Sequence, residues 1–228
     1  VQGFYFSKAV PADVLAKIIN ENFDSSLLSV ILGGVPETTE ILSHKFDYIF
    51  YTGNGHVGRI VMAAAAKNLT PVTLELGGKS PCLVFNKDID LAAKRTVWGK
   101  FFNSGQTCVA PDYILITKDN KEKFVESCQK WIKYFYGEKI QASKDYGRII
   151  NESHFDRIVN YIEDESQILL GGQSDKENLY ISPTLLSATK DSRVMAEEIF
   201  GPLLPIVEIE SLDKAIDFVR SESKPLAC

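Results

Sequence analysis

Cys108 is the residue whose type and surroundings point most directly to chemistry. It follows a predicted helix, in a loop that contains Gly105, Gln106 and Thr107. A thiolate is a soft nucleophile, and a cysteine in such a loop can be exposed and tuned for reactivity. A single cysteine is, by itself, more often a packed core residue. Its position alone therefore leaves two interpretations open, a nucleophile or a core side chain.

The four cysteines form no recognisable pattern. Cys82, Cys108, Cys128 and Cys228 are scattered too widely for a disulfide framework or a zinc site. This usage favours a reducing, intracellular setting. Cys128 falls on the apolar face of a predicted helix at 121–136, where apolar residues recur at spacings of three and four, and this indicates core packing.

The three histidines do not suggest a catalytic or metal-binding group. His44, His56 and His154 belong to no known pair for a metal site or a triad. We therefore expect each of them in a loop or on the surface, and we predict no metal site.

A glycine pattern at residues 53–58 could bind a nucleotide. Gly53, Gly55 and Gly58 match G-x-G-x-x-G between a predicted strand and a predicted helix, whose N-terminal N–H groups could bind a pyrophosphate. Glu75 follows about twenty residues later, at the spacing of a ribose-binding acid. However, it lies in a predicted Gly-rich turn, and glycines at a strand-to-helix turn often serve only the turn. The pattern supports a phosphate site and leaves Glu75 unassigned.

These residues are carried by an alternation of strands and helices. Such an alternation is typical of parallel sheets, because parallel strands need crossover connections. Hydrophobic spacing predicts helices at 13–20, 36–42, 57–67, 88–102, 121–136, 151–163 and 212–222, and strands at 28–32, 48–51, 72–74 and 113–117, with the strand at 48–51 buried.

Composition excludes several classes of function. The 228 residues are 45% apolar and 24% charged, which is typical of a globular chain. A net charge of −5 gives no reason to expect nucleic acid or an anionic membrane as a partner. No apolar run approaches the roughly 18 residues that span a bilayer.

Three segments together resemble the signatures of the aldehyde dehydrogenase family. They are Leu74–Pro81, which contains Glu75, Asn103–Pro111, which contains Cys108, and Glu197–Pro202. Tyr51-Thr52-Gly53 also resembles the start of the family's cofactor turn. The wording of residues 108–113 and 33–39 is most similar to the class 3 or fatty-aldehyde branch. The resemblance covers about residues 12 to 227.

The resemblance implies an α/β fold with two parts. Residues 1–74 are expected to be the C-terminal part of an NAD(P)-binding Rossmann-like domain with a parallel sheet. Residues 75–228 are expected to be an α/β catalytic domain that carries the thiol nucleophile. Both parts are expected to be three-layered and incomplete, because both chain ends look cut. We therefore expect the isolated chain to be unstable or inactive.

The resemblance also assigns the catalytic roles. Cys108 is expected to attack an aldehyde, forming a thiohemiacetal that passes hydride to the nicotinamide. Glu75 is expected to activate the water that hydrolyses the resulting thioester, a task for a carboxylate on a flexible Gly-rich turn. The Asn that completes the family's oxyanion hole would lie before residue 1. In the family's adenosine-ribose stretch, only Ser7 and Lys8 match.

Cofactor contacts follow from the same resemblance, with NAD or NADP as the cofactor. Glu198 is expected to bind the nicotinamide ribose and Phe200 to pack near the nicotinamide ring. The resemblance assigns four further residues to the cofactor: Gly53, Asn54, Gly58 and Leu76. Asn54 stands where the family commonly has Ser. Lys79 is expected to be structural.

The resemblance predicts oxidation of aldehydes to carboxylic acids, with medium- to long-chain or fatty aldehydes as substrates. It implies a homodimer, located in the cytoplasm or on a membrane such as the endoplasmic reticulum, with a membrane tail in some members of this branch. Two alternatives are a truncated, non-catalytic relative and a cysteine hydrolase that pairs Cys108 with a histidine base. A third is a CoA-acylating dehydrogenase, against which Glu75 argues.

Overall fold

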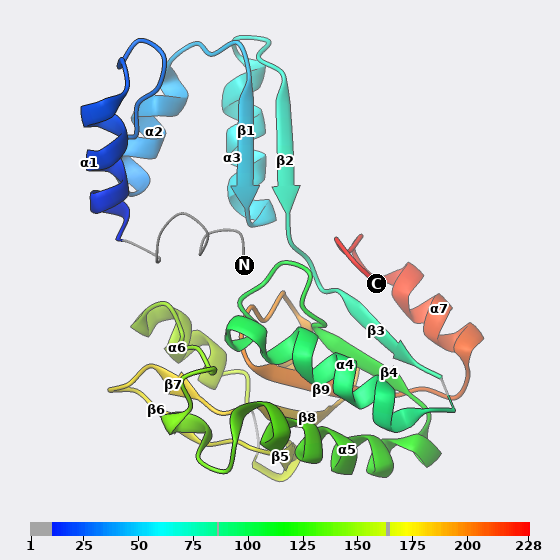
Figure 1. Ribbon diagram of the computed structural model, residues 1–228. Coiled ribbons are helices and arrows are strands. Elements are labelled where there is room, and N and C mark those ends of the chain that lie inside the picture. Colours follow the sequence, from blue (N-terminus) through cyan, green and yellow to red (C-terminus); the bar gives the residue numbers. More distant parts are fainter. Residues whose placement is uncertain (1–10, 86, 163–164) are drawn as a thin grey trace. The chain divides into compact units, whose positions relative to one another are not determined.

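The chain folds into two compact units (Figure 1). A computed structural model describes residues 11–85, 87–162 and 165–228, so Ser7, Lys8 and the predicted helix end at 163 lie outside the described residues. Unit 1 reaches to Thr52 and resumes from His56 to Leu74, and unit 2 comprises Gly53–Gly55 and Glu75–Cys228. The assignment of residues 1–74 to cofactor binding and 75–228 to catalysis stays a prediction.

The described residues of unit 1 form three helices, each close to a predicted one. They are α1 (Ala12–Asn22), α2 (Val35–Ser43) and α3 (Gly55–Ala66), part of whose first turn groups with unit 2. Pro36 lies in the first turn of α2, where its missing N–H costs no helical hydrogen bond. The Glu37 carboxylate accepts the backbone N–H of Gly34 at 2.7 Å, which satisfies a donor that the helix leaves free.

Two strands pair in a small sheet. β1 (Ile49–Gly53) and β2 (Val72–Leu76) are hydrogen-bonded neighbours that run in the same direction (Figure 1). The prediction that the strand at 48–51 is buried is wrong. Along β1, half-buried and exposed residues alternate, and Phe50 is 65% exposed. A strand covered on one face only shows this alternation.

The predicted strand at 28–32 is also wrong, because the structure has irregular backbone there. The backbone of Val30 bonds a side chain instead of another strand. Its N–H donates to the Asn20 side-chain oxygen at 2.8 Å, and its carbonyl accepts from the Asn20 amide at 2.9 Å. A β-branched run forms a strand only where a neighbouring strand takes up its hydrogen bonds.

Unit 2 is built on a five-stranded sheet of order β3-β4-β9-β8-β5. The first four strands are parallel, and β5 is antiparallel to β8. Their bounds are β3 (Pro81–Val84), β4 (Tyr113–Ile116), β9 (Leu203–Glu208), β8 (Thr184–Ala188) and β5 (Ile168–Leu170). A separate hairpin joins β6 (Ser174–Asp175) and β7 (Tyr180–Ile181).

Helices cover both faces of this sheet. α4 (Ile89–Phe101) and α5 (Lys118–Tyr136) pack on one face with Ile114 and Ile116 of β4. α6 (Glu152–Val159) and α7 (Leu212–Ser221) pack on the other with Tyr113 and Leu115. The side chains of β4 therefore alternate between two cores. Unit 2 is a three-layer α/β structure, which confirms the predicted fold class (Figure 1).

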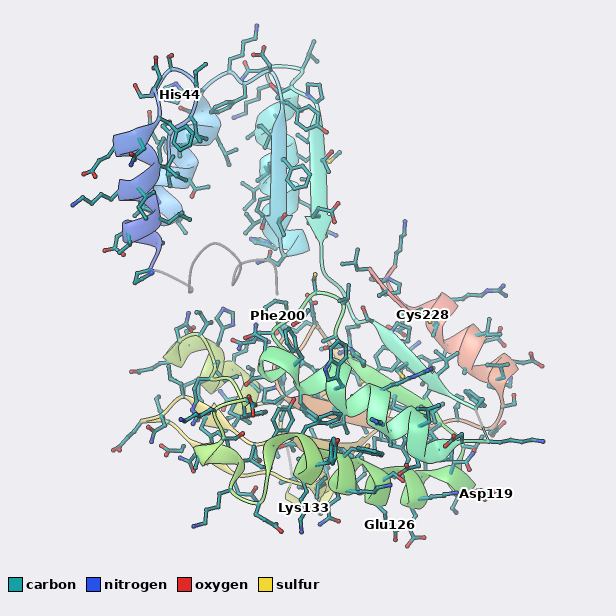
Figure 2. All side chains as sticks on the ribbon, viewed as in Figure 1. His44, Asp119, Glu126, Lys133, Phe200 and Cys228 are labelled. Carbon is teal, nitrogen blue, oxygen red and sulfur yellow. The ribbon has the colours of Figure 1, made fainter. Side chains whose placement is uncertain are left out.

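The long helix α5 confirms the prediction from its periodicity. Cys128 and Phe124 are fully buried against the sheet, and burial raises the pKa of the Cys128 thiol. Asp119, Glu126 and Lys133 lie on the outer face of the helix (Figure 2). Cys128 is therefore a core residue.

Helix α6 is shorter than predicted. It ends at Val159, although the apolar spacing continues to Ile162. The N–H groups of Tyr161 and Ile162 bond the carbonyls three residues earlier, at 3.2 and 3.1 Å, so the chain closes in turns instead of continuing the helix. The described part of the chain also has the short helices η2 (Phe102–Gly105), η3 (Ile140–Ala142), η4 (Glu165–Gln167) and η5 (Arg193–Met195).

Candidate active site

Cys108 lies in a loop, residues 102–110, that we call the cysteine loop. After α4, the chain turns through three residues of left-handed backbone, Asn103, Ser104 and Gly105, with φ values of 50°, 54° and 76°. Asn and Gly adopt this region readily, whereas Ser104 does so at an energetic cost. Ser104 is buried, so the surroundings hold it in place. The turn directs the chain away from α4 before it reaches Cys108.

The side chain of Gln106 anchors the cysteine loop. Its amide nitrogen donates to the carbonyls of Asn103 and Arg148 at 3.0 and 2.8 Å, and its oxygen accepts the N–H of Ile150 at 3.0 Å. Two residues later, Cys108 lies exposed in a turn closed by the Ala110 N–H on the Thr107 carbonyl. This exposure agrees with a reactive thiol, and in this structure Cys108 is not a core side chain.

Glu75 lies in a strand instead of a turn. β2 extends through Leu76, so the prediction that Glu75 is embedded in the Gly-rich turn is wrong. The reason is that the half-buried Leu74 and Leu76 alternate with the exposed Glu75, as in a strand, and the glycines begin only at Gly77. Glu75 is exposed and Leu76 is half-buried. The glycines that follow, with φ of 147° at Gly78, supply the conformational freedom expected of this motif.

The carboxylate of Glu198 lies against Gly77. A Cβ atom at Gly77 would come within 2.4 Å of a Glu198 carboxylate oxygen, so a larger residue there would displace this carboxylate. Burial raises the pKa of Glu198, and the nearby Asp112 carboxylate adds to this rise. A hydrogen bond from the backbone of Gly78 lowers it in part. Two motifs far apart in the sequence are thus in contact.

A second glycine joins the cysteine loop to the segment that carries Glu198. We call residues 194–201 the glutamate segment. A Cβ atom at Gly105 would lie 2.2 Å from the carbonyl oxygen of Gly201, so the two backbones touch. The structure therefore brings together the three segments that the sequence singled out, through Gly77 with Glu198 and Gly105 with Gly201.

Charged side chains hold the glutamate segment. The Lys79 ammonium donates to the carbonyls of Val194 and Glu197 at 3.1 and 2.9 Å and to the Asp112 carboxylate at 2.5 Å. Asp112 in turn accepts the N–H of Ile199 at 3.1 Å. These contacts support the structural role expected for Lys79.

Lys100 adds a buried cation to this group. Its side chain is fully buried, its Nζ lies 3.9 Å from the Asp112 carboxylate, and it has no hydrogen-bond partner. Burial lowers the pKa of Lys100 to about 8, against the opposing effect of Asp112. We did not foresee Lys100 or Asp112. The sequence held one signal for Lys100. It lies three residues after Val97 and four after Thr96, and this spacing puts it on the buried face of α4.

Phe200 is partly accessible, with 38% of its surface exposed, and is labelled in Figure 2. Its backbone has a φ of 48°, in the left-handed region that bulky residues rarely adopt. Such a conformation persists only where the surrounding structure enforces it, and residues strained in this way often lie at functional sites.

The predicted phosphate site has the expected local form. β1 ends at Gly53, a single residue, Asn54, follows, and α3 begins at Gly55. Gly58 is buried in the first turns of α3. The helix N-terminus therefore directly follows the strand, as phosphate binding requires. The cofactor roles of Gly53, Asn54, Gly58 and Leu76 stay predictions.

The histidines are exposed, as expected. His44 follows α2, and His56 and His154 lie on α3 and α6. Within the described ranges, no hydrogen bond is found between a histidine and Cys108, and the cysteine hydrolase stays an alternative. Among those same residues there is no cluster of His, Cys, Asp or Glu that could hold a metal, and no helix is long and apolar enough to cross a membrane.

Comparison with known proteins decides the family. The sequence model of the aldehyde dehydrogenase family matches residues 7–226. The chain belongs to the aldehyde dehydrogenase family. Membership agrees with the motifs around Glu75, Cys108 and Glu198, which the fold brings into one unit.

Relatives within the family place the chain in the predicted branch. It is 56% identical over 218 residues to the dimeric, NADP-preferring aldehyde dehydrogenase of Mus musculus, covering 95% of this chain and 48% of the relative. It is 50% identical to aldehyde dehydrogenase family 3 member A2 of Mus musculus, covering 95% and 45%. The chain thus spans about half the length of the curated relatives it matches.

Solved structures of the family have the same fold. The substrate-bound AldH of Staphylococcus aureus is 47% identical with a TM-score of 0.91, over 94% of this chain and 48% of that one. An aldehyde dehydrogenase of Mycobacterium tuberculosis, complexed with NAD+, is 30% identical with a TM-score of 0.77, over 90% and 45%.

Proposed function

We propose that the whole protein oxidises aldehydes to carboxylic acids with NAD or NADP. The observation that carries this proposal is the exposed Cys108 thiol, in a loop that contacts the glutamate segment through Gly105 and Gly201. A nucleophile and a cofactor-binding carboxylate on touching segments suit a reaction in which a bound carbonyl is attacked and then oxidised.

The proposed reaction begins at the Cys108 sulfur. The thiolate adds to the aldehyde carbon and forms a thiohemiacetal on the enzyme. A bound nicotinamide would supply the hydride acceptor for this carbon; the thiohemiacetal hydroxyl would lose its proton to solvent, and a thioester would remain on Cys108. Glu75 then takes a proton from a water molecule that attacks the thioester, and the carboxylic acid departs with the thiol restored. The exposed position of Glu75 on β2, just before the Gly77-Gly78 turn, is compatible with this role.

The residues present fit a nicotinamide cofactor. The N-terminus of α3 after Gly53 and Asn54 would hold the pyrophosphate, by the general affinity of helix N-termini for anions. Glu198 would accept hydrogen bonds from the ribose, and Phe200 and Leu76 would pack on the nicotinamide side. The close contact of the Glu198 carboxylate with Gly77, where a larger residue would displace it, supports this assignment.

We further propose medium- to long-chain or fatty aldehydes as substrates, in keeping with the class 3 likeness of residues 108–113 and 33–39. The name of the NADP-preferring, dimeric relative supports use of NADP and a homodimer. We also propose that the whole protein lies in the cytoplasm or on an organelle membrane such as the endoplasmic reticulum. A tail outside this chain would provide the membrane association.

Substitution of the exposed cysteines tests the proposal in the whole protein. Reduction of NAD and NADP would be followed with hexanal and hexadecanal for the wild type, Cys108→Ala and Cys228→Ala. Cys228 is a matched control, because it is also an exposed thiol. We expect Cys108→Ala to lose on the order of a thousandfold or more of the rate, as removal of a covalent nucleophile does, and Cys228→Ala to keep it.

The rival functions give different results in this assay. A wild type that cleaves p-nitrophenyl acetate but oxidises neither aldehyde with either cofactor would be a cysteine hydrolase. A wild type that does neither would be a non-catalytic relative. Aldehyde oxidation that requires CoA and yields an acyl-CoA in place of the free acid would indicate an acylating dehydrogenase.

A further inference from the structure

Helix α6 supports the glutamate segment through the side chain of Arg157. One guanidinium nitrogen of Arg157 donates to the carbonyl of Ile199 at 2.7 Å, and the other donates to the carbonyl of Glu198 at 3.4 Å. The guanidinium is a planar fork, so it can serve two adjacent carbonyls at once, which an ammonium cannot do in the same geometry. The backbone on which the Glu198 side chain is mounted is therefore bound to α6.

Arg157 is itself fixed by Tyr161 and Glu197. It donates to the Tyr161 hydroxyl oxygen at 2.7 Å and lies 3.7 Å from the Glu197 carboxylate. The Tyr161 hydroxyl donates to that same carboxylate. Burial raises the pKa of Tyr161 to about 12, so the hydroxyl keeps the proton that it donates. The guanidinium thus has partners on both sides and a defined orientation.

A packing contact continues this support to the end of the glutamate segment. A Cβ atom at Gly201 would lie 2.5 Å from Ile158 Cδ1, so α6 packs directly on the Gly201 backbone. Phe200, between the two contacts, has the left-handed φ of 48°. Arg157 on one side and Ile158 on the other hold the residues from which Glu198 and Phe200 project.

We propose that Arg157 is a positioning residue for the cofactor. By fixing the carbonyls of Glu198 and Ile199, it orients the Glu198 carboxylate for hydrogen bonds to a ribose. This inference rests on the proposed function. It separates two parts of the reaction: Arg157 serves cofactor binding and hydride transfer, and it has no part in the attack by Cys108.

The test uses the whole protein with Arg157→Met and Arg157→Lys. Three quantities are measured: the KM for NAD or NADP, the kcat of aldehyde oxidation, and the rate of p-nitrophenyl acetate hydrolysis without cofactor. The ester reaction needs the thiol of Cys108 but no nicotinamide. Arg220→Met is the matched control, because Arg220 is an exposed arginine on α7.

We expect Arg157→Met to raise the cofactor KM about tenfold and to lower kcat, as expected for the loss of charge-assisted hydrogen bonds. The rate of ester hydrolysis should stay within about twofold of that of the wild type, because this reaction does not use the cofactor that Arg157 helps to position. Arg157→Lys should resemble Arg157→Met, since it keeps the charge and loses the fork. Arg220→Met should match the wild type in all three quantities.

Two results would overturn the inference: unchanged cofactor KM and oxidation in Arg157→Met, or a parallel fall in ester hydrolysis. If Arg157→Met does not fold, Tyr161→Phe provides the test, since it removes only the hydroxyl that fixes Arg157. It should raise the cofactor KM about threefold, less than Arg157→Met, because Arg157 keeps its bonds to the Glu198 and Ile199 carbonyls and loses one partner that fixes it. An unchanged KM would refute the proposal. Failure of the proposed function is distinguishable, because the wild type would then oxidise no aldehyde.

Discussion

The cysteine loop and the glutamate segment touch each other, yet they are held in different ways. The cysteine loop is fixed by uncharged groups, mainly the amide side chain of Gln106, and by left-handed backbone at residues 103–105. The glutamate segment is fixed by three charged side chains, Lys79, Asp112 and Arg157, which bond its backbone.

This difference suits the roles that we propose for the two segments. A nucleophile must be reached by its substrate, and Cys108 lies exposed, two residues beyond the anchor at Gln106. A carboxylate that orients a cofactor must keep its direction, and hydrogen bonds to charged groups are stronger than neutral ones. Rigidity is therefore concentrated where the cofactor would bind, and access where the thiol lies. The following predictions test this contrast, from the largest expected effect to the smallest.

The contact between the two segments should be the most sensitive point. Gly105→Ala would put a methyl group 2.2 Å from the Gly201 carbonyl at a φ of 76°. We expect the whole protein to lose about 4 kcal/mol of stability, from left-handed strain and overpacking together. Denaturant unfolding of the wild type and the variant measures this loss.

Gly137→Ala separates the two causes. Gly137 has a similar φ of 80°, but a Cβ atom there would meet nothing within 4 Å. We expect it to cost only about 1 kcal/mol, the strain alone. Equal losses in the two variants would show that the contact with Gly201 does not matter.

The charged anchoring should be the next most sensitive. Lys79→Met removes the donor to Val194, Glu197 and Asp112 and leaves Asp112 with a distant cation only. Because the Lys79–Asp112 pair is mostly buried, we expect a loss of about 3 kcal/mol. Thermal or denaturant unfolding would measure it.

Lys130→Met is the control for this prediction. Lys130 also pairs with a carboxylate, that of Asp90, but the two side chains are 60% and 41% exposed. Exposed pairs contribute below about 1 kcal/mol. If Lys79→Met were no worse than Lys130→Met, the charged anchoring of the glutamate segment would be unimportant.

The buried Lys100 should make stability depend on pH. Its pKa is about 8 in the folded protein and 10.5 ordinarily, so below pH 8 both states carry the proton and burial costs stability. Between pH 8 and 10.5 the folded state releases its proton first, and stability rises. We expect Lys100→Met to be about 1 kcal/mol more stable than the wild type at pH 7, with a gap that narrows as the pH rises through this range.

The measurement is a series of unfolding curves from pH 7 to above pH 10, with the exposed Lys123 as a control in Lys123→Met. The control should show no such narrowing. A gap between Lys100→Met and the wild type that stays constant or widens with pH would contradict the assignment.

Much of the fold can be predicted from sequence periodicity, and α5 shows why. The apolar spacing of α5 has one cause, the sheet beneath it, so it predicted both the helix and the burial of Cys128. The prediction of a strand at 28–32 was wrong because an apolar run does not show whether a partner strand is present. Val30 bonds Asn20 instead.

The candidate site, too, was predicted only in part. Its motif residues were named from the sequence, and Cys108 proved to be exposed in a loop as expected. The residues that support the site, Arg157, Asp112 and Lys100, were not found. Their roles come from contacts across long sequence separations, such as Arg157 with Ile199, which no local pattern encodes. Lys100 alone left a trace, a charge on the buried face of α4.

The central claim is that Cys108 carries the reaction as a covalent acyl group. Intact-mass and peptide analysis of the whole protein with Glu75→Gln, mixed with hexanal and NADP or NAD, tests this most directly. Loss of the base should let the thioester accumulate, so we expect one hexanoyl group on Cys108 and none when Cys108→Ala is added. Hexanoyl at another residue, or continued acid formation in Cys108→Ala with no adduct at all, would contradict the account.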